Sequence, residues 1–173
     1  MSSAVGLNKP VIGKPKPAKH EKSKPRKKKT SRQIIEKKLD ELVREIVLAR
    51  DPACVCPSPE KGHSDVRQCG HLFTRSKKSV RWSLVNCQCQ CSSCNLLHEF
   101  NPHRYVMSFI HKFGLCKYQE LYKDAETPSL LKTYELEELY EQLSVIRERQ
   151  KNEPEWLPYF SQKDILSGAW RTG

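Results

Sequence analysis

The sequence lacks any apolar run of the roughly 18 residues that a membrane-spanning helix needs. Its first 30 residues also lack the apolar segment of a secretory signal peptide. Apolar residues make up 37% of the 173 residues, aromatic residues 8%, and the mean hydropathy is −0.71. These values predict one small hydrophobic core, no membrane partner and a cytoplasmic location.

Eight cysteines offer the support that a small core needs. In a reducing cytoplasm, clustered cysteines favour zinc binding over disulfides. Cys91 and Cys94 form a CxxC, a spacing that lets both thiolates reach one ion from a tight turn. The expected partners are Cys54 and Cys56, which complete a four-sulfur structural Zn²⁺ site.

Three other cysteines receive different interpretations. Cys87 and Cys89 lie close enough in sequence to compete as zinc ligands. Cys116, between Leu115 and Lys117, is predicted to be a buried small apolar residue. A zinc ion held by four thiolates has no open coordination position, so any catalytic metal must lie elsewhere.

Most of the net charge of +11 lies in residues 1–30, which contain ten Lys/Arg residues and a single acidic residue. This segment also contains four prolines and shows no apolar period, so a disordered basic tail is predicted. Lys27, Lys28 and Lys29 end the tail and suit contact with a phosphate backbone. A solubilising or nuclear-import-like extension is the alternative interpretation.

Two amphipathic helices are expected to flank a loop-rich centre. Thr30 to Gln33 has the form of a capping box, and apolar residues then recur at helical spacing until Asp51. A second helix is expected over about 128–150, where four apolar residues form an a/d-like stripe: Leu136, Leu139, Leu143 and Ile146. Packing on the domain's own core is favoured over a homodimer seam. Residues 151–173 are taken as a C-terminal extension that frays from Ser161.

Between the cysteine pairs, extended stretches at 66–72 and 79–85 predict a β-hairpin. Gly70 before His71 is expected to let a substrate approach the imidazole closely. Asn86 falls where the hairpin returns to His71, and Asn95 falls in the first turn of a following helix. A lone histidine is a weak signal, and the order His, Asn, CxxC-Asn carries the information.

This stretch resembles the HNH, or ββα-metal, nucleases, and specifically the phage NinG/Rap recombination endonuclease family. The resemblance covers about residues 31–150 and rests on five stretches: 69–75, 81–82, 86, 90–95 and 101–114. It implies an α+β fold with a small zinc-braced ββα-metal module flanked by amphipathic helices, occupying 31–150.

The resemblance also implies a mechanism. His71 would be the general base for phosphodiester hydrolysis, leaving a 5′-phosphate and a 3′-hydroxyl. Asn86 would orient the imidazole or its loop, and Asn95 would bind a catalytic Mg²⁺ (or Mn²⁺). Many HNH nucleases place an Asp just before the histidine. Here Gln68 ranks first as the second ligand, ahead of His98 and Asp65.

The implied substrate is branched recombination DNA, such as Holliday junctions or D-loops, in the host cytoplasm if the protein is phage-encoded. Four basic residues after His71 would grip flanking phosphates, or would form a solvated charged loop: Arg75, Lys77, Lys78 and Arg81. The competing hypothesis is a zinc-stabilised DNA-binding protein without catalysis. A sequence-preferring homing or restriction type of HNH enzyme is the third.

Overall fold

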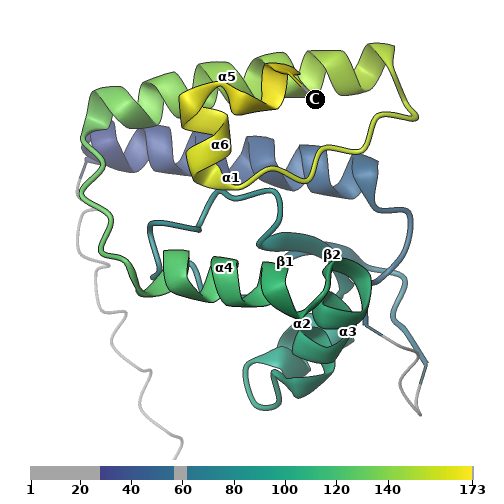
Figure 1. Ribbon diagram of the computed structural model, residues 1–173. Helices are drawn as coiled ribbons and strands as arrows, with labels where there is room; N and C mark the ends of the chain where they lie inside the picture. The colour runs from purple at the N-terminus through teal and green to yellow at the C-terminus, as the bar shows by residue number, and fades with distance from the viewer. Residues whose placement is uncertain (1–27, 57–61, 173) are drawn as a thin grey trace, which may run out of the picture.

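The computed structural model describes residues 28–56 and 62–172. Most of the predicted basic tail, including Lys27, lies outside the described residues, while Lys28 and Lys29 are exposed. Helices surround a two-stranded sheet in a mixed, helix-rich fold (Figure 1). The elements are α1 (Ser31–Arg50), β1 (Arg67–His71), β2 (Cys87–Cys91), α2 (Ser92–His98), α3 (His103–Phe113), α4 (Leu115–Glu126), α5 (Thr133–Asn152), α6 (Gln162–Ser167) and the 3-10 helix η1 (Ala169–Thr172).

The two long helices, α1 and α5, lie side by side and form one layer (Figure 1). The predicted capping box is present, because Thr30 and Gln33 exchange side-chain hydrogen bonds with each other's backbone. Each of the four apolar residues of the α5 stripe has 0% exposure and belongs to the core cluster that includes α1. The stripe therefore packs on the chain's own core, as the favoured interpretation held, and does not form an exposed dimer seam.

Strands β1 and β2 form an antiparallel hairpin in which His71 pairs with Cys87 and Gln68 pairs with Gln90. Because side chains alternate along a strand, the register divides the hairpin residues between two faces. One face carries Arg67, Cys69, His71, Cys87, Cys89 and Cys91, and three of these, Cys69, Cys87 and Cys89, belong to the core cluster with α1 and α5. The other carries Gln68, Gly70, Gln88 and Gln90 and meets α2 and α3.

The return strand differs from the prediction, because residues 79–85 form turns and β2 begins at Cys87. The cause is Asn86, which is 0% exposed. Its Oδ1 accepts a hydrogen bond from Phe73 N at 2.8 Å, and its Nδ2 donates to Phe73 O and Val80 O, both at 3.0 Å. One amide side chain thereby forms hydrogen bonds with three backbone groups of the loop between β1 and β2, which take no part in strand pairing.

The C-terminal extension does not fray as predicted. Ser161 and Asp164 form a capping box at the start of α6, and Ile165 and Trp170 are buried in the core of α1 and α5. These apolar anchors outweigh the polar composition of the segment. Helix α4 was not predicted from the sequence. Cys116, which lies on α4, is exposed, whereas the sequence predicted that it would be buried.

A buried ion pair, Arg50–Asp51, connects the end of α1 to β2 and to the C-terminal segment. Arg50 at the end of α1 donates to both carboxylate oxygens of Asp51, at 2.9 and 2.7 Å. The same guanidinium donates to the carbonyl oxygens of Leu84, Cys87 and Pro158. Asp51 in turn accepts from Cys89 N at 3.0 Å, so α1 fixes the position of β2.

None of the eight cysteines, all of which are described, forms a disulfide. No helix in the described ranges is both long enough and apolar enough to cross a membrane.

Gly70 has a packing role inside the protein, and its role in substrate approach stays a prediction. A Cβ added there would overlap Oε1 of Gln90 and lie 2.6 Å from its Cδ. We expect Gly70→Ala to lower the free energy of unfolding by about 1–3 kcal/mol, measured by chemical denaturation. The double variant Gly70→Ala/Gln90→Ala relieves the overlap, so it should be less destabilised than the sum of the two single variants. Simple additivity would contradict this explanation.

Candidate functional site

The clearest site is a group of three cysteines and one histidine. The ligand atoms of Cys54, His63, Cys91 and Cys94 all lie within 4.8 Å of one another. Cys91 caps α2, where its Sγ accepts a hydrogen bond from Cys94 N at 3.4 Å. The His63 Nδ1 lies 3.4 Å from the Cys91 Sγ and 3.8 Å from the Cys94 Sγ.

This group includes three of the four cysteines predicted from sequence and replaces Cys56 with His63. The Cys56 Sγ instead accepts a hydrogen bond from Gln90 Nε2 at 3.3 Å. The available signal for His63 was the need for a fourth ligand near the CxxC.

The chemistry of the group fits zinc. Three sulfurs and one imidazole nitrogen form a Cys₃His set, which is typical of closed structural zinc sites. Hydrogen bonding from Cys56 and backbone amides lowers the pKa of Cys54 to about 4 against the opposing effect of burial. Although burial alone would raise the pKa of Cys91, bonds from Cys94 N and His63 lower it. Thiolates are therefore favoured at Cys54 and Cys91, whereas burial and the neighbouring sulfurs of Cys91 and Cys54 raise the pKa of Cys94 to about 12.

The two amides predicted to bind the catalytic ion do lie together. Asn95 is in the first turn of α2, as expected, and its Nδ2 donates to Gln68 Oε1 at 2.7 Å. Both side chains are partly exposed, on the hairpin face that meets α2. They contribute neutral amide oxygens and no carboxylate, so water would have to complete the shell of a hard divalent ion.

His71 does not join this pair. It lies at the end of β1 on the opposite face of the hairpin from Gln68, and its imidazole groups with Cys69 and Cys87. Burial and the nearby charge of Arg75 together lower the pKa of His71 to about 4, against the opposing charge of Asp40. The imidazole is therefore neutral at pH 7, with a lone pair able to accept a proton.

The side chain of Asn86 forms hydrogen bonds neither with His71 nor with the Gln68–Asn95 pair. Both ends of its amide bind the loop that follows His71, and its backbone oxygen accepts from Leu72 N at 2.9 Å. Of the two orienting roles predicted for Asn86, the observed hydrogen bonds correspond to holding the loop.

Of the four basic residues after His71 that were predicted to bind phosphates, three form ion pairs within the chain. Lys77 pairs with Glu126, Lys78 with Glu36, and Arg81 with Asp40 and Glu36. The Lys77 pair is exposed and therefore weak enough for a phosphate to replace. Arg81 is held by two carboxylates of α1, and Arg75 is exposed.

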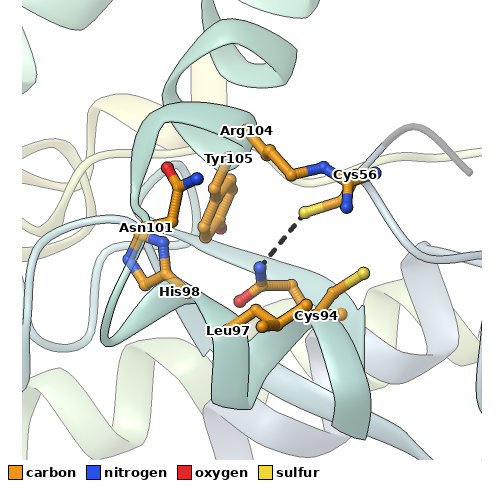
Figure 2. Close-up of a pocket in the computed structure, with 8 residues that line it drawn as sticks. Cys56, Cys94, Leu97, His98, Asn101, Arg104 and Tyr105 are labelled. Carbon is orange, nitrogen blue, oxygen red and sulfur yellow. Dashed lines mark hydrogen bonds between the residues drawn. The ribbon is translucent and has the colours of Figure 1, made fainter. Parts of the chain in front are cut away.

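A small cavity of about 10 Å³ lies between the hairpin and helices α2 and α3, with room for a single water. Figure 2 shows His98, Asn101 and Tyr105 on one side of it and Cys56 and Cys94 on the other. Its dashed line marks the hydrogen bond between Gln90 Nε2 and the Cys56 Sγ. Among the described residues, Gln90 Oε1 and His98 Nδ1 are buried without a hydrogen-bond partner. The cavity is too small for a nucleotide.

Comparison with known proteins adds a family to this geometry. The family model described as "Bacteriophage Lambda NinG protein" matches residues 12–153. The chain belongs to the NinG family. The match spans the Cys₃His group, the hairpin and helices α1 to α5, so Gln68, His71, Asn86 and Asn95 all lie within the NinG region. The search of curated proteins and the search of solved structures each found no match.

Proposed function

We propose that this NinG-family protein is a metal-dependent DNA endonuclease that acts on branched recombination intermediates, such as Holliday junctions or D-loops. Membership of the family suggests a phage protein related to recombination. The catalytic assignment is supported by the adjacency of Gln68 and Asn95 where the hairpin meets α2, as expected for a ββα-metal module. Zinc in the Cys₃His group would brace this module and take no part in the reaction.

In this proposal each residue has a limited task. Gln68 and Asn95 would hold a Mg²⁺ or Mn²⁺ ion, which when bound neutralises the scissile phosphate and stabilises the leaving oxygen. His71, neutral at pH 7, would take a proton from the attacking water. Asn86 would hold the loop after His71 so that the end of β1 keeps its position.

The decisive experiment is cleavage of a four-way junction and of linear duplex with the same sequence, with and without Mg²⁺. We expect Mg²⁺-dependent nicking that prefers the junction, and a loss of about 10²–10⁴-fold in rate for His71→Ala. His111→Ala is the matched control, because His111 is exposed on α3 and belongs neither to the His71 group nor to the Gln68–Asn95 pair. Equal rates on junction and linear DNA would contradict the branched substrate.

One observation favours a second candidate, a zinc-stabilised DNA-binding protein without catalysis. His71 and the Gln68–Asn95 pair occupy opposite faces of the hairpin, so they do not converge on one point. If the protein binds junction DNA but does not nick it with Mg²⁺ or Mn²⁺, and His71→Ala leaves binding unchanged, this candidate replaces the nuclease.

A further inference from the structure

A second group of metal-binding side chains lies on the α1 face of the hairpin. The Sγ atoms of Cys69 and Cys87 and a ring nitrogen of His71 all lie within 4.8 Å of one another. Their positions follow from the register, because Cys69 and His71 are two residues apart on β1 and His71 pairs directly with Cys87. Two hydrogen-bonded strands therefore hold all three ligands, and no loop movement is needed to assemble them.

This group is separate from the Cys₃His group. Cys87 and Cys91 stand at opposite ends of β2, which at about 3.3 Å per residue places them about 13 Å apart. Cys89 lies between them, directly opposite Cys69 and on the same face, yet it belongs to neither group. The hairpin thus presents one candidate metal group at each end.

The surroundings suit a soft divalent ion. Cys87 is 0% exposed and Cys69 7% exposed, while His71 is half-buried and gives the group access to solvent. Burial and the neighbouring Cys69 thiol raise the pKa of Cys87 well above its ordinary value, and the positive charges of Arg50 and Arg75 oppose this rise, as a bound cation would. Two thiolates would neutralise a divalent ion, which avoids burying a net charge.

We propose that Cys69, His71 and Cys87 form a second site for zinc or a similar soft divalent ion, with two sulfur ligands, one nitrogen ligand and a fourth position open to water. Binding releases the two thiol protons to solvent, and the ion keeps its charge of +2 throughout. The imidazole donates its lone pair to the ion. This inference does not rest on the proposed nuclease function.

The two proposals nevertheless interact at His71. A metal-bound imidazole cannot also accept a proton from water, so an ion in this second site would block the general base. The site would then act as an inhibitory site for soft metals, distinct from both the structural zinc and the hard catalytic ion.

The test is the zinc content of the full-length protein, purified in the presence of zinc and measured by elemental analysis after dialysis. Two bound zinc ions per chain are expected for the unmodified protein, and one for Cys69→Ser and for His71→Ala. Cys89→Ser is the matched control, because Cys89 is equally buried on the same face, and this variant should retain two. Cobalt titration should show two thiolate-to-cobalt components, of which Cys69→Ser loses one.

One zinc in the unmodified protein, or two retained in both Cys69→Ser and His71→Ala, overturns the proposal. A disulfide between Cys69 and Cys87, detected by mass spectrometry alongside a single zinc, also overturns it. Failure of the nuclease is measured separately, because zinc in the second site would block His71: an absence of Mg²⁺-dependent nicking by Cys69→Ser, which lacks the second site and keeps His71 free, refutes only the proposed function. Nicking with a single zinc bound refutes only the second site.

Discussion

Removing the zinc that we propose for the Cys₃His group should unfold the hairpin and α2. Structural zinc contributes about 10–16 kcal/mol of apparent binding free energy in small domains, and the whole stability of a domain is about 5–15 kcal/mol. We therefore expect a strong chelator to abolish the cooperative thermal transition or to lower its midpoint by tens of degrees. Circular dichroism and calorimetry with and without chelator would measure this loss.

Cysteine variants separate this effect from a general effect of losing a thiol. Cys94→Ser removes one ligand of the group and should reproduce the effect of the chelator. Cys116→Ser alters an exposed cysteine on α4 and should leave both the transition and the zinc content unchanged. A chelator-treated protein with an unaltered melting curve would show that the four residues carry no stabilising metal.

Asp51→Asn should produce the second largest loss. Arg50 is 0% exposed at its side chain and Asp51 8%, so neutralising Asp51 leaves a guanidinium buried without its countercharge. Breaking such a buried pair costs about 3–5 kcal/mol, measured by urea or guanidinium denaturation. Lys37, whose ion pair with Glu41 is exposed, offers the control, and Lys37→Ala should change stability by less than about 1 kcal/mol.

The same pair should be visible in the pH dependence of stability. Burial alone would raise the pKa of Asp51, but the hydrogen bonds and charge of Arg50 bring it below the ordinary value of 3.8. A carboxyl with a lowered folded pKa stabilises the protein above the unfolded value, and this contribution disappears as the pH falls through the folded value. The stability of the unmodified protein should therefore fall more steeply below about pH 4 than that of Asp51→Asn. Parallel curves would mean that Asp51 is not held as a carboxylate.

Local signals in the sequence predicted the parts of the fold that depend on neighbouring residues. The capping box at Thr30 and the apolar stripe of α5 are of this kind, because helical period and end chemistry act over one or two turns. The placement of β2 failed for the opposite reason. Asn86 closes its loop through backbone groups of Phe73 and Val80, which leave no side-chain pattern.

The candidate site likewise combines local features that the sequence predicted with contacts between distant residues that it did not. The CxxC spacing located Cys91 and Cys94, and the helix start located Asn95 beside Gln68. His63 was not predicted because a loop histidine has no period, and its role depends on which ligands the CxxC meets in space. The group of Cys69, His71 and Cys87 depends on strand register, which a one-residue shift would have abolished.

The Arg50–Asp51 pair also bears on the order in which the chain folds. Its guanidinium binds Pro158 O and its carboxylate binds the Tyr159 hydroxyl, and both partners are synthesised more than a hundred residues later. Until residues 158 and 159 have been synthesised, these two partners are missing, and the charged groups of Arg50 and Asp51 can remain hydrated. We therefore expect the Arg50–Asp51 pair to become buried late, only after residues 158 and 159 have been synthesised.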